Sequence, residues 1–282
     1  FTVVLDAEPA SDVVLTITSD DTGEATVNSP LTFTSANWDT PQTITVTGVD
    51  DDLIDGDIVS TVTVVVDDAN SNDDFDAVAD QTVSVTTTDD DVAGFTIVES
   101  DGSTEVAESG TTDTFTIVLD AQPTSDVVLT VTSSDTGEAT VTSSLTFTPA
   151  NWDTPQTITI TGVDDDIIDG TVTSTITISV VDASSNDNFD SVADQTLSAT
   201  TTDDDVAGFT IVESDGSTEV DESGTTDTFT VVLDAEPNSD VVLTISSDDT
   251  GEATVTNALT FSSANWDTPQ TITITGADES IL

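Results

Sequence analysis

A repeat of 114 residues constrains the fold of this chain more than any other feature of its sequence. Phe1 begins the segment FTVVLDAEPASDVVLTI, and nearly the same sequence begins again at Phe115 and at Phe229, so both spacings are 114 residues. Three tryptophans keep this period, each within ANWDTPQTIT: Trp38, Trp152 and Trp266. A unit of this length has the size of an ordinary domain and is too long for a solenoid repeat. The sequence therefore predicts a row of similar domains.

The apolar residues within a repeat follow the period of β-strands. Residues 157–161 and 174–179 alternate strictly between Thr or Ser and Ile, which indicates strands with one buried face. About seven short strands in roughly 100 residues are typical of an immunoglobulin-like β-sandwich, so the predicted class is all-β. Phe115, Phe147 and Trp152 are expected in the core. In the middle repeat we expect strands at 95–98, 115–119, 127–132, 139–141, 145–147, 157–161, 174–180 and 195–201.

The repeat also sets the expected domain limits. The first domain covers 1–91 and lacks its opening strand, the second covers 92–205 and is complete, and the third covers 206–282 and lacks its closing strands. No linker rich in Gly, Ser or Pro separates them, because the joints read TTTDDDVAGFT. We therefore expect a window on a longer tandem array, in which each domain passes to the next through an acidic hinge.

All charged side chains have the same sign. The 282 residues include 57 Asp and Glu and no Lys, Arg or His, so the formal charge is −57. Nucleic acid and anionic membrane surfaces are excluded as expected partners, since both attract basic residues. No apolar run is long enough to suggest membrane insertion. Val, Ile, Leu and Phe in alternating patterns argue against a disordered acidic polymer, provided that something external screens the carboxylates.

Many of the acids gather at expected loops instead of scattering. Runs after the fifth strand comprise Asp50, Asp51, Asp52 and Asp55, then Asp164, Asp165, Asp166 and Asp169, and finally Asp278 and Glu279. Runs at the domain ends comprise Asp89, Asp90 and Asp91, and Asp203, Asp204 and Asp205. Single acids precede the strands at Phe115 and Phe229: Glu108 and Glu222. In a seven-strand sandwich these three positions can meet at one pole.

Crowded carboxylates repel one another unless they are protonated or bind a cation. With no basic residue in the chain, a metal ion is the natural counter-charge. Oxygen ligands without His or Cys select Ca²⁺ or Mg²⁺ over Zn²⁺, and Ca²⁺ accepts six to eight oxygens in flexible geometry. The alternative is that the runs are solvated surface in a salt-adapted protein. Recurrence of the triplets at loop positions with the 114-residue period favours calcium.

The pattern VAESGTTDTFTIVLDAQPTSDVVL … SLTFTPANWDTPQTITITGVDDDIIDG … TTTDDD resembles Calx-β domains, in particular the Calx-β-like repeats of large bacterial surface proteins. The resemblance covers nearly the whole chain. It implies an immunoglobulin-like sandwich with calcium ions at one end. The implied ligands are an acid before the second strand, an Asp-rich loop after the fifth strand and an Asp run after the last strand. The acid runs listed above match these positions, with Glu108 as the acid of the second repeat.

The sequence departs from the family pattern at three places. Where the family has a Gly-x-Asp-Tyr segment after the third strand, this chain reads SSDTGEATV, which leaves Asp135 and Glu138 as alternatives for that ligand. The third repeat reads ADES, so Ser280 replaces an Asp. The first repeat has no counterpart of Glu108. Only the second repeat is expected to carry the full ligand set.

Three classes of function compete at this point. The first is a calcium-stabilised extender of a long extracellular repeat protein, an adhesin stalk or surface filament, whose partners are the neighbouring repeats and like chains in a fibre. The second is an adhesion module that binds a glycan or protein, which the near-identity of the repeats and the 5% aromatic content disfavour. The third is an enzyme, which is disfavoured because His, Cys, Lys and Tyr are all absent and these supply most nucleophiles and general bases. A carboxylate pair could still hydrolyse glycosides, but no single pair stands out from the repeating clusters, so we expect no enzymatic activity.

Overall fold

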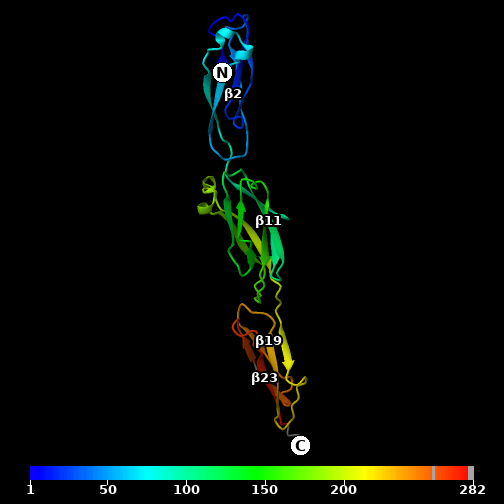
Figure 1. The fold of residues 1–282 in the computed structure, drawn as a ribbon. Coiled ribbons are helices and arrows are strands. Elements are labelled where there is room, and N and C mark those ends of the chain that lie inside the picture. Colours follow the sequence, from blue (N-terminus) through cyan, green and yellow to red (C-terminus); the bar gives the residue numbers. More distant parts are fainter. Residues whose placement is uncertain (256–257, 279–282) are drawn as a thin grey trace.

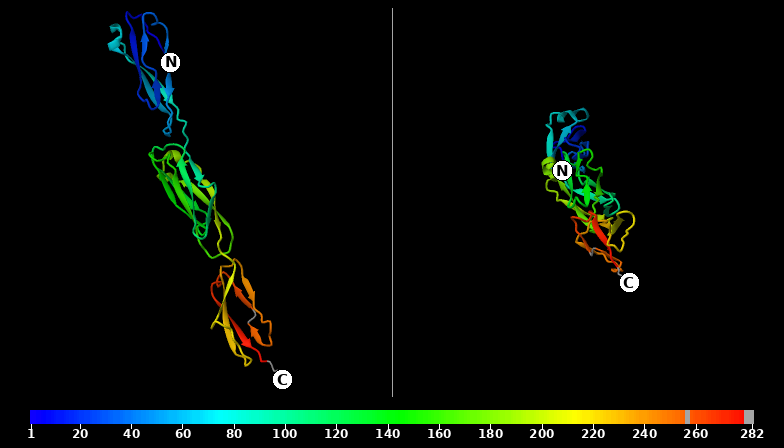
Figure 2. Two further views of the ribbon diagram at one scale, coloured as in Figure 1. Left: turned by 90° about the vertical axis from the view of Figure 1, so that its right-hand side faces the viewer. Right: turned by 90° about the horizontal axis from the view of Figure 1, so that it is seen from below.

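The structure is a computed structural model that describes residues 1–255 and 258–278 and is built almost entirely from β-strands. Its strands form three groups that lie end to end in an elongated row (Figures 1 and 2). The predicted all-β class is confirmed. The helical elements of the described residues are four short 3-10 turns: η1 (Asp68–Asn70), η2 (Asp73–Phe75), η3 (Asp182–Ser184) and η4 (Asp187–Phe189). No described helix has the length and apolar character needed to cross a bilayer.

The second repeat forms two sheets packed face to face. One sheet has the strand order β10-β17-β16-β12-β14 and the other β13-β15-β11-β9. Inward side chains of both sheets, such as Phe115 and Ile158 from one and Leu129 and Ile176 from the other, share one core. The strands are β9 (Phe95–Glu99), β10 (Thr104–Ala107), β11 (Thr112–Leu119), β12 (Val127–Ser133), β13 (Ala139–Val141), β14 (Ser144–Phe147), β15 (Gln156–Gly162), β16 (Val172–Val180) and β17 (Gln195–Thr202).

Eight of these nine strands correspond to the ranges expected from sequence. The ninth, β10, was missed because its partner is remote: Thr104–Ala107 pairs in parallel with residues 199–202 of β17, almost 100 residues later. Phe115 and Phe147 are fully buried, as expected. Trp152 packs against the same core, and its carbonyl oxygen accepts a hydrogen bond from the Leu119 N–H at 3.1 Å.

The first repeat repeats this plan with fewer strands. Its core gathers Phe33, Ile44, Val62 and their neighbours between a sheet of order β4-β2-β7-β8 and the pairs β1-β5 and β3-β6. The strands are β1 (Thr2–Val3), β2 (Val13–Ser19), β3 (Ala25–Val27), β4 (Leu31–Phe33), β5 (Gln42–Thr43), β6 (Val46–Gly48), β7 (Ile58–Val66) and β8 (Gln81–Thr87).

The third repeat contains counterparts of residues 92–168 only, and its core is accordingly smaller. Phe209 is 52% exposed, whereas its counterpart Phe95 is 2% exposed beneath the strands that close the second repeat. The sheets have the orders β18-β19-β23-β21 and β20-β22. The strands are β18 (Phe209–Glu213), β19 (Thr226–Leu233), β20 (Val241–Thr244), β21 (Ala253–Val255), β22 (Ala258–Phe261) and β23 (Gln270–Gly276).

Candidate metal centre

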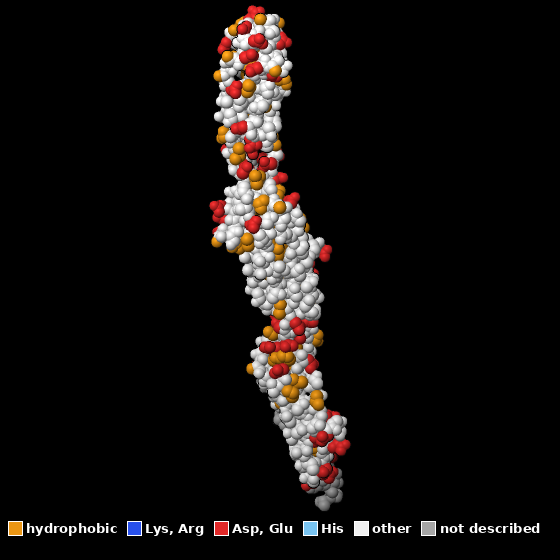
Figure 3. All heavy atoms as spheres, viewed as in Figure 1, with side chains coloured by type: hydrophobic (Ala, Val, Ile, Leu, Met, Phe, Trp, Pro, Cys, Tyr) orange, Lys and Arg blue, Asp and Glu red, His pale blue; other side chains and the backbone are white. Residues whose placement is uncertain are grey.

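Acidic side chains collect where one group of strands meets the next. Figure 3 shows Asp and Glu at both narrow regions of the molecule, while much of the surface between them on this face carries neither. The order of the strands explains the placement, because the loop after β15, the end of β17 and the turn between β10 and β11 all lie at the same pole of the second repeat. Acids that are about 95 residues apart in sequence therefore become neighbours.

Strand β10 places Glu108 at the centre of this pole. The strand runs parallel to β17 up to the pair Ala107–Thr202, so the next residue of each strand enters the same region. The Glu108 N–H donates to the Thr202 carbonyl oxygen at 3.1 Å, which continues the ladder by one residue. Strand β15 passes so close beneath Ala107 that only glycine fits at Gly162. The backbone at Glu108 is thus held from two sides.

The Glu108 carboxylate is buried without a partner. Its side chain is 0% exposed, and neither Oε1 nor Oε2 has a hydrogen-bond donor. Glu138, which is 6% exposed, and Asp205 each have one further buried oxygen without a donor. An unpaired buried carboxylate is costly, and the chain contains no Lys, Arg or His that could compensate it. A bound cation would supply the positive charge that these buried carboxylates lack.

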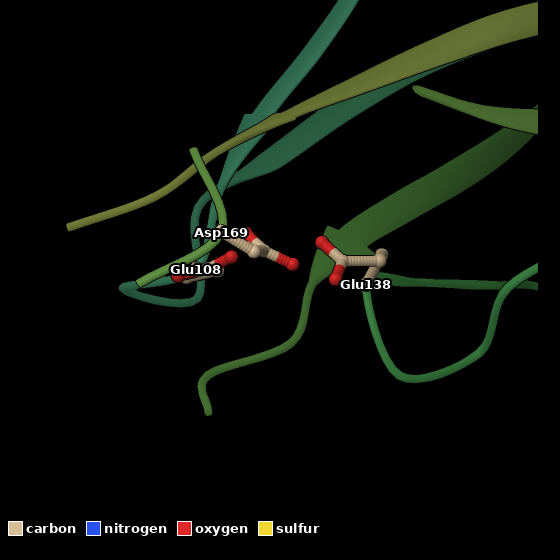
Figure 4. Close-up of side chains that lie close together, drawn as sticks. All are labelled: Glu108, Glu138 and Asp169. Carbon is tan, nitrogen blue, oxygen red and sulfur yellow. The ribbon is translucent and has the colours of Figure 1, made fainter. Parts of the chain in front are cut away.

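Two overlapping sets of acids surround Glu108. One joins Glu108 with Glu138 and Asp169, and the other joins it with Asp203 and Asp205; in each set the ligand oxygens lie within 4.8 Å of one another. Figure 4 shows the Asp169 carboxylate extending from beside Glu108 toward Glu138. Five carboxylates in one place, with no nitrogen or sulfur donor, suit a hard oxygen-loving ion such as Ca²⁺. The donor set therefore fits the expected metal.

The electrostatics agree with this geometry. Burial, followed by the charges of Asp165, Asp203 and Glu138, raises the pKa of Glu108 from 4.5 to about 7. The Asp204 backbone amide opposes this rise, although neither Glu108 oxygen receives a hydrogen bond of good geometry. Burial also raises the pKa of Glu138, with Asp169 as the next contributor.

Asp203 connects two of the acidic loops through backbone hydrogen bonds. Its Oδ2 accepts from the Gly170 N–H at 2.7 Å and its Oδ1 from the Asp205 N–H at 2.8 Å. The first repeat has the same arrangement, in which Asp89 accepts from Gly56 at 2.7 Å and from Asp91 at 2.9 Å. Gly56 has a φ of 79° and Gly170 a φ of 78°, values that favour glycine. These bonds connect the loops through groups of the protein alone.

The structure does not gather every expected ligand of the second repeat. Asp165 lies near enough to raise the pKa of Glu108, and its Oδ1 accepts from the Ile167 N–H at 2.7 Å. Asp164, Asp166 and Asp204 are exposed and belong to neither set. Glu138 belongs to one set, whereas Asp135 accepts from the Gly137 N–H at 2.9 Å within its own turn.

The other two repeats carry partial versions of the site. In the first repeat a small cavity of about 30 Å³ is lined by Glu24 together with Asp50, Asp51, Asp55, Asp89, Asp90 and Asp91. Asp52 is exposed outside it. In the third repeat Glu222, the counterpart of Glu108, is exposed, and so is Asp278. Glu279 lies outside the described residues. Burial of the central glutamate therefore distinguishes the second repeat.

No protein-family model matches the chain, and no curated protein matches its sequence. Similar solved structures include domains 4 and 5 of the S-layer protein SbsC, with 19% identity over 67% of this chain and 70% of that one and a TM-score of 0.33. The apo form of the Calx CBD1 domain has 16% identity over 39% of this chain and 98% of that one, with a TM-score of 0.30. The two-domain CBD12 of CALX1.2 has 16% identity over 66% and 76%, with a TM-score of 0.29. Likeness at this level carries no argument about function.

The raised pKa of Glu108 predicts how the stability of the calcium-free protein depends on pH. The folded state holds this proton up to about pH 7, whereas a carboxyl in the unfolded chain loses it near 4.5. Between these values the folded state binds more protons, so the free energy of unfolding should fall as pH rises, by up to about 3 kcal/mol. Urea unfolding in calcium-free buffer at pH 5 and pH 8 measures this fall in the free energy of unfolding. Because the many other acids of the chain also make its stability depend on pH, the contribution of Glu108 is the difference between the parent and Glu108→Gln. The free energy of unfolding of Glu108→Gln should fall less between the two pH values.

Proposed function

We propose that this chain is a calcium-stabilised extender segment of a long extracellular repeat protein, an adhesin stalk or surface filament of the Calx-β-like type. The observation that carries the proposal is Glu108, a fully buried glutamate with both oxygens unpaired, surrounded by Glu138, Asp169, Asp203 and Asp205. Calcium bound there would supply the missing positive charge and stabilise the folded state by mass action. The chain's role in this proposal is mechanical and not enzymatic.

The position of the acids supports a role in the shape of the array. Asp203 and Asp205 end the second repeat only a few residues before Gly208 and strand β18 begin the third. Bare carboxylates at this seam repel one another, and salt screens them only partly within a Debye length of about 8 Å. Calcium would remove the repulsion and bind the end of one repeat to the loop beside the next.

Small-angle X-ray scattering of the full chain, with and without calcium at matched ionic strength, tests the proposal. We expect a long rod with calcium and a shorter, more variable particle after chelation. In the variant with Asp203→Asn, Asp204→Asn and Asp205→Asn, the response to calcium should be largely lost. A maximum dimension that ignores calcium, or an equal response in the triple variant, would contradict calcium stiffening at this seam.

A further inference from the structure

One residue of the first repeat belongs to the core of the second. Ile54 follows the Asp triplet of the first repeat and is only 9% exposed. It clusters with Phe95, Phe189 and the other buried residues of the second repeat, and among the described residues it is the single member of that cluster from before residue 92. The apolar interior of the second repeat therefore extends across the joint.

Backbone hydrogen bonds hold Ile54 in this position. The Ile54 N–H donates to the Gln122 carbonyl oxygen at 3.1 Å, and the Gln122 N–H donates to the Asp52 carbonyl oxygen at 2.6 Å. Leu53 and Gln122 thus form a parallel β-bridge between the two repeats. The Asn188 side-chain amide donates to the Ile54 carbonyl oxygen at 3.1 Å, from the turn that carries the buried Phe189. None of these bonds involves a carboxylate oxygen.

The second joint repeats the arrangement. Ile167 and Glu236 form the parallel bridge. The Ile168 N–H donates to the Glu236 carbonyl oxygen at 3.2 Å, and the Glu236 N–H donates to the Asp166 carbonyl oxygen at 2.6 Å. Gln122 and Glu236 occupy equivalent positions with different side chains, so the bridge depends on backbone groups. Ile168 is half-buried and lines an apolar pocket of about 280 Å³ with the exposed Phe209 and with Leu233, Val241 and Leu243, which belong to the core of the third repeat.

We infer that the residues after each Asp run, Leu53-Ile54 and Ile167-Ile168, form a latch that completes the apolar core of the following repeat. The partner of this surface is the next repeat of the same chain. The latch has a direction, since at both joints the earlier repeat supplies the isoleucine and the later repeat supplies the receiving backbone. It goes beyond the proposed function because its contacts involve no metal ligand: apolar burial and backbone pairing remain at the joint after chelation, and calcium adds further stiffness to it.

The absence of cysteine allows a direct test on the full chain. Spin labels on Val59→Cys and Val98→Cys, two exposed positions on β7 and β9, report the distance between the first and second repeats by double electron–electron resonance. The parent should give a narrow distance distribution in calcium and a moderately broader one after chelation, because the latch contacts remain when the calcium contacts are lost. Ile54→Asp, which places a charge in the receiving core, should broaden the distribution at least twofold in both conditions. Ile54→Ala is a milder second variant and should broaden it less.

Ile54→Leu is the matched control, because the third repeat carries Leu282 at the equivalent sequence position. This variant should keep the narrow distribution. A distribution for Ile54→Asp and Ile54→Ala as narrow as that of the parent would overturn the latch. A chelated parent with a distribution as broad as that of chelated Ile54→Asp would also overturn it, because the joint would then depend on the metal alone. The measurement after chelation therefore tests the latch whether or not calcium binds as proposed.

Discussion

Calcium at a hundredfold excess over its Kd should raise the melting temperature of the second repeat by on the order of 10 °C, and Glu108→Gln should remove most of that rise. A ligand at this excess stabilises the folded state by about 2.7 kcal/mol, and a domain of this size gains roughly 4 °C per kcal/mol. Glu108 belongs to both sets of converging acids. Gln keeps the volume of the side chain but removes the charge. Differential scanning calorimetry with and without calcium measures the effect.

Glu222→Gln is the matched control for this prediction. It makes the same chemical change at the equivalent position of the third repeat, where the side chain is exposed. In this variant the rise in the melting temperature of the second repeat with calcium should equal that of the parent. In the calcium-free protein at pH 8, above the pKa of about 7 of Glu108, Glu108→Gln should be at least as stable as the parent, since it removes an unpaired buried charge. An undiminished calcium response in Glu108→Gln would show that calcium binds elsewhere.

Gly162→Ala should destabilise the second repeat by about 3 kcal/mol and weaken calcium binding there. A Cβ atom at Gly162 would lie far inside van der Waals contact with the carbonyl oxygen and carbon of Ala107. These are backbone atoms, so the segment that carries Glu108 must move. Overpacking of this kind costs about 1–3 kcal/mol, occasionally more. Urea unfolding and calcium titration of the variant measure the two effects.

Gly48→Ala makes the same change in the first repeat, where the outcome should differ. A Cβ at Gly48 would meet only the Thr87 side chain, at an ordinary contact distance of 3.8 Å. The free energy of unfolding should therefore change by less than about 1 kcal/mol, as expected for a substitution that creates no clash. If Gly48→Ala and Gly162→Ala were equally destabilising, the need for glycine at Gly162 would come from the geometry of the strand and not from the close approach of Ala107.

The sequence predicted the parts of the fold that depend on local pattern. The alternation at 157–161 and 174–179 gave β15 and β16, and the expected Asp loops lie at one pole of the second repeat. Strand β10 could not be predicted, because its four residues are ordered by a parallel partner almost 100 residues away. The domain limits and the calcium ligands remain predictions.

Two features of the site and its surroundings could be identified only from the structure. The SSDTGEATV segment offered both Asp135 and Glu138 as ligands, and only the packing of β13 shows that Glu138 faces the buried cluster. Ile54 and Ile168 look like ordinary apolar residues in an acidic loop. Their recurrence at a spacing of 114 residues indicates a packing role, because an apolar residue that recurs in an exposed loop usually contacts other apolar residues. The sequence did not show which repeat supplies those contacts.

X-ray diffraction from calcium-loaded crystals of the full chain, with anomalous data, tests the central claim most directly. The account predicts an anomalous peak at the pole of the second repeat, with a Glu108 oxygen and oxygens of Asp203, Asp205 or Asp169 at the 2.3–2.6 Å typical of calcium coordination. Well-ordered density for Glu108 with no peak beside it, at a calcium concentration that stabilises the protein in solution, would contradict the account.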